Sequence, residues 1–219
     1  MSNVISVSER RRELDVYAEA PLPTERGLFR VVVFRERRSG AEHVAMVMGD
    51  VAAESVLARI HSECLTSEVL GSLKCDCRAQ LDRALDLIAD TGRGVLLYLR
   101  QEGRGIGLGN KIRAYALQNQ GADTVEANVQ LGFEADARSY DIAAAILADL
   151  DVKSVRLMTN NPAKVQGLEK EGVKVAKRVS HWVGENPHNK GYLAVKRRKM
   201  GHHPDTALQL RALPKAAKG

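Results

Sequence analysis

The sequence predicts an α/β fold: a mixed β-sheet with flanking helices and with antiparallel strands at its N-terminal end. Between residues 95 and 179, strand-like stretches alternate with stretches of helical periodicity, a succession typical of a largely parallel sheet. Ahead of this region, short polar connections between β-branched stretches favour antiparallel pairing. Hydrophobic residues make up 44% of the chain and charged residues 27%, which is ordinary for a globular protein.

The chain of 219 residues is long enough for one sizeable domain. We expect this domain to span residues 14–203. A mobile tail over residues 1–13 and a loosely ordered basic tail over residues 204–219 are expected to flank it.

The N-terminal strands are predicted from β-branched and aromatic residues. Residues 28–35 form the first such stretch, and residues 43–48 form its return strand. The polar segment between them, residues 35–42, contains Gly40 and is typical of a hairpin loop. Residues 56–61 are predicted to be a third strand of this antiparallel group.

The remaining elements follow from apolar spacing and from residues that begin or end helices. Leu81, Leu85 and Ile88 recur at helical spacing, and Gly92 is a natural end for that helix. Asn161-Pro162 is a typical helix start. Strands are expected over residues 95–99, 154–159 and 173–179, and helices over residues 77–90, 110–121, 140–150 and 162–170.

Charge is distributed unevenly along the chain. The net charge is +6, but residues 164–219 carry 13 Lys and Arg against 4 Asp and Glu. A basic segment favours a polyanionic partner, either a nucleotide triphosphate or nucleic acid. Aromatic residues make up only 4%, which argues against single-strand binding by base stacking. No apolar stretch is long enough for a membrane span, so we expect a cytoplasmic protein without a membrane partner.

All three cysteines, Cys64, Cys75 and Cys77, fall in one short stretch between a predicted strand and a predicted helix. Three thiolates suit one zinc ion per chain, because three protein ligands leave the fourth tetrahedral position for water. Cys75 and Cys77 lie at the start of the helix, where the helix dipole favours a thiolate. The plainer alternative is three ordinary buried cysteines. An odd count and the lack of an export signal disfavour a disulfide.

A glycine-rich segment, residues 100–109, follows a predicted strand and precedes a predicted helix. Bare backbone amides near a helix N-terminus can cradle an anion. The segment matches neither the Walker A pattern nor the dinucleotide fingerprint, so a surface loop is the alternative. Glu102 and Arg104 are its candidates for contacts with a metal ion and a phosphate.

Taken together, the motifs resemble the GTP cyclohydrolase II family from about residue 15 to residue 202. The resembling segments are Arg59-Ile-His-Ser-Glu-Cys64, Cys75-Asp-Cys77, Arg100-Gln-Glu-Gly-Arg104, Asn110-Lys-Ile-Arg-Ala-Tyr115, Thr124-Val-Glu-Ala-Asn128, Asp136-Ala-Arg138 and Thr159-Asn-Asn-Pro-Ala-Lys164. The chain departs from the family pattern at Ser180-His181-Trp182.

The resemblance implies zinc-dependent hydrolysis of GTP, the first step of riboflavin biosynthesis, with release of formate and pyrophosphate. Cys64, Cys75 and Cys77 would hold the zinc ion, and water activated there would attack carbon 8 of the purine. The family is also expected to form a homodimer. The residues expected to bind GTP are Arg59, Ile60, His61, Ser62, Glu63, Gln80, Glu102, Gly103, Arg104, Thr124, Thr159 and Lys164.

Three further residues have implied catalytic roles. Asp136 corresponds to the family's proposed proton acceptor, and Arg138 to its proposed nucleophile toward the α-phosphate. A guanidinium is a poor nucleophile, so an Arg138 that stabilises phosphate charge is the simpler interpretation. Tyr115 would orient the attacking water or the opened ring. Glu102 would face magnesium on the triphosphate.

Two alternatives stay open. A relative in the same family could stop at the formamidopyrimidine product, although Tyr115 favours full turnover. A zinc-stabilised module that binds nucleic acid through residues 164–219 is the alternative from another class.

Overall fold

The computed structural model describes residues 13–121, 124–133 and 138–201. The predicted tails fall outside these residues, apart from Glu13. The predicted proton acceptor, Asp136, also lies outside them.

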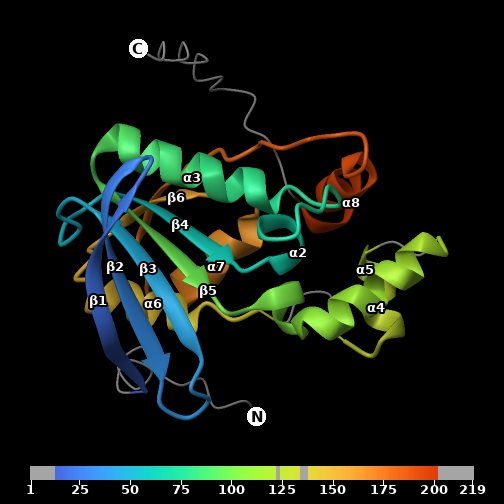
Figure 1. Ribbon diagram of the computed structural model, residues 1–219, viewed down its shortest axis with the longest axis horizontal. Helices are drawn as coiled ribbons and strands as arrows, with labels where there is room; N and C mark the ends of the chain where they lie inside the picture. Colours follow the sequence, from blue (N-terminus) through green and yellow to red (C-terminus); the bar gives the residue numbers. More distant parts are fainter. Residues whose placement is uncertain (1–12, 122–123, 134–137, 202–219) are drawn as a thin grey trace.

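One seven-stranded mixed sheet forms the centre of the fold (Figure 1), in the order β1-β2-β3-β5-β4-β6-β7. The pairs β1–β2, β2–β3 and β3–β5 are antiparallel. The pairs β5–β4, β4–β6 and β6–β7 are parallel. The strands are β1 (Leu14–Thr24), β2 (Gly27–Glu36), β3 (Glu42–Met48), β4 (Val56–Ser62), β5 (Gly94–Leu99), β6 (Val155–Met158) and β7 (Val175–Val179). The predicted mixed sheet with antiparallel strands at the N-terminal end is confirmed.

The predicted position of β4 is wrong. We expected it to extend the antiparallel group, but it lies between β5 and β6 and pairs in parallel with both, with His61 opposite Tyr98 and Ala58 opposite Leu157. Six of its seven residues are buried, as is typical of a central strand. Strand β1 was not predicted. It contains Pro21 and Pro23, which are tolerated because β1 is an edge strand.

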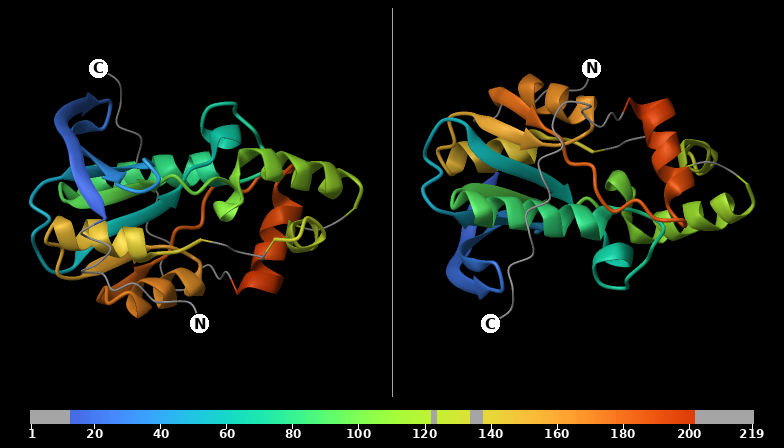
Figure 2. Two further views of the ribbon diagram at one scale, coloured as in Figure 1. Left: turned by 90° about the horizontal axis from the view of Figure 1, so that it is seen from below. Right: turned by 90° about the horizontal axis from the view of Figure 1, so that it is seen from above.

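Helices cover both faces of the sheet (Figure 2). Ala84 and Ile88 of α3 pack against one face, whereas Ile146 of α6 and Leu168 of α7 belong to the core cluster on the other. The helices are α2 (Leu65–Glu68), α3 (Cys77–Thr91), α4 (Gly107–Asn119), α5 (Thr124–Gln130), α6 (Asp141–Asp149), α7 (Pro162–Lys170) and α8 (Lys190–Met200), with a 3-10 turn η1 (Glu102–Gly105). Helices α2, α5 and α8 were not predicted.

The two predicted helix boundaries have the expected causes. Gly92 ends α3 in the left-handed region with φ 68°, which glycine adopts without steric cost. The side chain of Asn161 accepts a hydrogen bond from the Ala163 amide and so caps α7.

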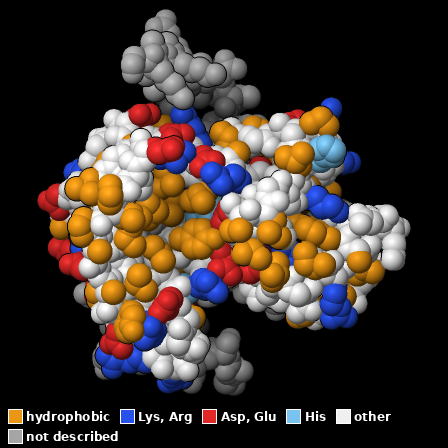
Figure 3. Space-filling view, viewed as in Figure 1, with side chains coloured by type: hydrophobic (Ala, Val, Ile, Leu, Met, Phe, Trp, Pro, Cys, Tyr) orange, Lys and Arg blue, Asp and Glu red, His pale blue; other side chains and the backbone are white. Residues whose placement is uncertain are grey.

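Helices α2, α4 and α8 lie beyond the carboxyl ends of β4 and β5 (Figure 1). Apolar side chains gather in the middle of the face drawn in Figure 3. Val69, Leu70 and Leu73, which follow α2, are among the exposed large apolar residues. Among the described residues, no helix is both long and apolar enough to cross a membrane.

Candidate active site

A pocket opens at the carboxyl ends of the parallel strands, the usual ligand position in sheets of this kind. Arg59 and His61 reach it from β4, Thr159 from the end of β6, and Lys111 from α4. Lys196 reaches it from α8. Four elements that are distant in sequence therefore meet at one cavity.

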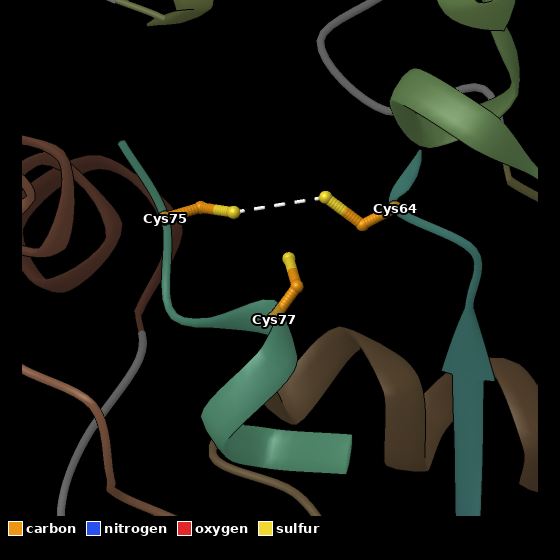
Figure 4. A group of neighbouring side chains, drawn as sticks. All are labelled: Cys64, Cys75 and Cys77. Carbon is orange, nitrogen blue, oxygen red and sulfur yellow. Dashed lines mark hydrogen bonds between the residues drawn. The ribbon is translucent and has the colours of Figure 1, made fainter. Parts of the chain in front are cut away.

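The three cysteines form a cluster in the wall of this pocket (Figure 4). Cys64 follows β4, and Cys77 is the first residue of α3. The three Sγ atoms lie within 4.8 Å of one another, and those of Cys64 and Cys75 are 3.7 Å apart. Two sulfur ligands of a tetrahedral ion, each bound at about 2.3 Å, would lie about 3.8 Å apart. The cluster can therefore hold a metal ion with little rearrangement.

The surroundings of Cys64 favour a thiolate. Hydrogen bonds with Cys75 and Cys77, together with one from the Lys111 ammonium, lower the pKa of Cys64 well below its ordinary value. The Lys111 Nζ lies 3.0 Å from the Cys64 Sγ. A low pKa matters because a thiol must lose its proton to become a metal ligand.

Glu102 joins Lys111 to the backbone of the site. One carboxylate oxygen accepts hydrogen bonds from the Lys111 Nζ and the Gly103 amide, each at 2.8 Å. The other accepts from the Leu65 amide at 2.8 Å, directly after Cys64. The Glu102 side chain is only 6% exposed. It thus links the glycine-rich segment to the loop that carries the first cysteine.

Arg59 is buried beneath the pocket floor. Its NH1 donates to the Met158 carbonyl, and its NH2 donates to the Gln80 Oε1. Burial lowers its pKa to about 10, so the guanidinium stays charged at neutral pH. Its buried Nε has no hydrogen-bond partner in the described part of the chain.

His61 belongs to a second buried network. Its Nε2 donates to Glu68 at 2.6 Å, and the Tyr98 hydroxyl donates to the other oxygen of the same carboxylate at 2.6 Å. Burial lowers the pKa of His61, which favours the neutral ring. Its Nδ1 is buried, and no described residue offers it a hydrogen bond.

A sequence model of the family described as GTP cyclohydrolase II matches residues 15–180. The chain belongs to the GTP cyclohydrolase II family. It is 59% identical to the GTP cyclohydrolase-2 of Actinobacillus succinogenes, over 84% of this chain and 86% of that protein. It is also 59% identical to the GTP cyclohydrolase-2 of Aeromonas hydrophila, over 84% of this chain and 94% of that protein. For the GTP cyclohydrolase-2 of Histophilus somni the identity is 57%, over 87% and 88%.

Most of the residues singled out from the sequence of this GTP cyclohydrolase II family member share the one pocket. They are Arg59, His61, Ser62, Glu63, Cys64, Cys75, Cys77, Gln80, Glu102, Gly103, Arg104, Tyr115, Arg138, Thr159 and Lys164. Ile60 is fully buried in the core, and its carbonyl accepts a hydrogen bond from the Lys164 Nζ at 2.8 Å. Thr124 begins α5, but its side chain lies outside the description.

Three lysines of the pocket were missed by sequence reasoning: Lys74, Lys111 and Lys196. Lys111 had a signal, because it lies four residues before Tyr115 and so on the same face of the predicted helix. Lys74 sits beside the cysteine motif and lies over the Tyr115 ring at 5.0 Å. Lys196 belongs to the basic segment that favours a polyanionic partner, but no pattern in the sequence placed this lysine beside the cysteine motif.

The Ser180-His181-Trp182 segment packs beside the pocket, against residues that line it. The His181 amide donates to Asn160, and its Nε2 donates to the Gln80 carbonyl at 2.8 Å. The Trp182 ring lies 4.3 Å from the Arg197 guanidinium on α8. The segment therefore ties α3 to the loop after β6 and contacts α8.

Proposed function

We propose that this protein hydrolyses GTP, opening the guanine ring and releasing formate and pyrophosphate, as a step of riboflavin biosynthesis. The observation that carries the proposal is a three-cysteine cluster in the wall of a strongly cationic pocket. The carboxylates that line the pocket are Glu63 and Glu102. The cations that line it are more numerous: Arg59, Lys74, Arg104, Lys111, Arg138, Lys164 and Lys196. Such an excess suits a triphosphate, and the thiols suit the metal that ring opening needs.

We assign the cysteine cluster to one zinc ion per chain. Soft thiolate ligands favour zinc over magnesium or calcium. Zinc held there would lower the pKa of water to about 7 and so supply the nucleophile for carbon 8. Three thiolates around a divalent ion leave one net negative charge, and the Lys111 ammonium beside Cys64 offsets it.

Several of these cations are proposed to hold the nucleotide beside the cysteine cluster. Lys164 and Arg104 would bind the phosphates, and the buried Nε of Arg59 would donate to an acceptor of the substrate. Tyr115 would orient the attacking water; burial raises its pKa to about 12, so its hydroxyl keeps its proton at neutral pH. Thr124, Asp136 and the other residues named from the family resemblance keep their proposed roles.

Magnesium at Glu102 remains a proposal that requires a rearrangement. Both oxygens of this carboxylate already accept hydrogen bonds. A magnesium ion arriving with the triphosphate would compete with the Lys111 ammonium for Oε1 and loosen that contact. Lys111 would then be free to approach the phosphates.

Arg138, which lines the pocket, is proposed to act on the phosphates. A guanidinium stays protonated at neutral pH, so it would stabilise the charge that develops as pyrophosphate leaves. Ring opening and pyrophosphate release would then depend on different groups.

We further propose a homodimer in the cytoplasm. The exposed apolar side chains after α2 offer a surface for a second copy. A reducing compartment would keep the three thiols available for metal.

The direct test incubates purified protein with GTP and magnesium and measures formate, pyrophosphate and bound zinc together. We expect one formate and one pyrophosphate per GTP consumed, and one zinc per chain. A product that retains the formyl carbon would show that the reaction stops at the formamidopyrimidine. No consumption of GTP by zinc-loaded protein would contradict the proposal.

A further inference from the structure

The C-terminal helix α8 brings a buried cation next to the cysteine cluster. Lys196 is 9% exposed, lines the pocket, and places its Nζ 2.8 Å from Asp76, the residue between Cys75 and Cys77. Helix α8 begins at Lys190, beyond residue 180, where the match to the family model ends. None of the predicted site residues comes from this helix.

Lys196 is the first member of a chain of hydrogen bonds that crosses the pocket floor. One oxygen of Asp76 accepts from Lys196, and the other accepts from the Gln80 Nε2 at 2.5 Å. The Gln80 Oε1 in turn accepts from the Arg59 guanidinium. The chain therefore runs from α8 through the start of α3 to β4.

This arrangement fixes the orientation of the Gln80 amide. Its NH2 group can only donate, and it faces the Asp76 carboxylate. Its oxygen can only accept, and it faces Arg59. A rotated amide would set its NH2 group against a guanidinium, two donors facing each other. The negative charge on Asp76 thus selects the orientation that holds Arg59.

One nitrogen of the Arg59 guanidinium is left for a ligand. NH1 and NH2 are engaged by Met158 and Gln80, whereas the buried Nε has no acceptor among the described residues. A buried donor without an acceptor is unfavourable, so the position suits a ligand that brings one. Arg59 lines the pocket, where a nucleotide would lie.

We propose that Lys196 is a positioning residue that, through Asp76 and Gln80, aims the Arg59 Nε at an acceptor of the purine nucleotide. This inference rests on the proposed function. The Lys196 ammonium acts through Asp76 and does not contact the substrate itself. Without it, Asp76 would be a buried carboxylate lacking its cation and would turn toward Arg59, breaking the Gln80 contacts.

The test compares Lys196→Met with Lys190→Met, a matched loss of an exposed lysine from the same helix. Formate release from GTP is followed in zinc-loaded protein, and bound zinc is measured by elemental analysis. Misplaced binding groups cost on the order of 100-fold. We expect Lys196→Met to lose about that factor in kcat/KM, mainly through KM, while its zinc content and the Lys190→Met kinetics stay as in wild type.

A second comparison asks whether Lys196 works through Gln80. In a Gln80→Met background, Lys196→Met should lower kcat/KM by no more than about twofold, because residues that share one network are not additive. The proposal would be overturned if Lys196→Met lowered kcat/KM by the same factor in the Gln80→Met background as in wild type. It would also be overturned if Lys196→Met kept the wild-type KM, or if that variant lost its zinc.

A double variant and the wild-type protein serve as controls for this test. If Lys196→Met does not fold, the pair Asp76→Asn with Lys196→Met removes both buried charges and should show the same rise in KM. Failure of wild-type protein to release formate would refute the proposed function instead, and would do so without any variant.

Discussion

Ion pairs in the antiparallel half of the sheet differ from those in the pocket. Arg30 and Glu19, on β2 and β1, pair at 3.0 Å with side chains 48% and 55% exposed. Lys111 and Glu102, beside the cysteine cluster, pair at 2.8 Å with side chains 12% and 6% exposed. Exposed pairs contribute little to stability, whereas a buried charge that loses its partner is strongly unfavourable. The fold thus concentrates costly charges where the proposed chemistry needs them.

The largest effect should come from the cysteine cluster. Cys75→Ser removes one of the three sulfur ligands, so we expect bound zinc and formate release to be lost together, with activity falling by at least about a thousandfold. Elemental analysis and a formate assay on the same sample measure both. Full zinc content in this variant would show that the three-thiolate site is wrong.

The next largest effect should come from Arg138. Arg138→Ala removes a cation from the phosphate region, and loss of such a group costs roughly 100-fold to 1,000-fold in kcat. We expect pyrophosphate release to fall by that factor while zinc remains bound. Arg138→Lys should fail nearly as badly, because an ammonium cannot reproduce the planar fork of donors. If Arg138→Lys released pyrophosphate at the wild-type rate, a positive charge alone would be enough at this position.

Removal of one partner from each ion pair compares the antiparallel half of the sheet with the pocket directly. Lys111→Met leaves Glu102 buried without its cation and should lower the free energy of unfolding by about 3–5 kcal/mol. Arg30→Met, its matched control in the exposed pair, should change it by less than about 1 kcal/mol. Urea denaturation measures both. Equal effects would remove the distinction between the two regions.

The last prediction concerns pH. Burial lowers the pKa of His181 to about 2, below its ordinary value of 6.5, so the folded protein keeps this ring neutral. The unfolded chain binds a proton there below pH 6.5, and stability should therefore fall as pH drops through the range from 6.5 toward 2. The slope attributable to His181 approaches about 1.4 kcal/mol per pH unit.

Chemical denaturation of His181→Gln between pH 7 and pH 4 checks this slope. The variant should lose stability less steeply than wild type as the pH is lowered. The exposed His188 provides the matched control, because His188→Gln should follow the wild-type slope. Parallel curves for wild type and His181→Gln would contradict the assignment.

The sequence predicted which residues share the pocket better than it predicted the order of the strands. Local spacing was enough to predict that the cysteines lie together, because Cys75 and Cys77 flank a single residue at a helix start. The neighbours of β4 could not be predicted, since a strand's own pattern shows its burial and not which strands lie beside it. The short hairpin between β2 and β3 misleadingly suggested that the next strand would continue the antiparallel group.

Contacts over long distances in the chain explain what was missed at the site. Lys196 and Asp76 are 120 residues apart, and no local pattern in either segment indicates that they meet. The apolar residues of α8 are interrupted by a run of cations, and the sequence indicated only a basic segment there. The contact between Lys196 and Asp76 forms only in the folded chain, where α8 lies beside the start of α3.

We propose that zinc held by the cysteine cluster would supply ring opening, whereas separate groups release pyrophosphate. Wild-type protein stripped of zinc by a chelator and incubated with GTP and magnesium tests it most directly, with formate and pyrophosphate measured in parallel and zinc then added back. The account predicts no formate, some continued pyrophosphate release, and recovery of formate with zinc. Formate release at the original rate without zinc would contradict it, as would complete loss of pyrophosphate release by protein that still binds GTP.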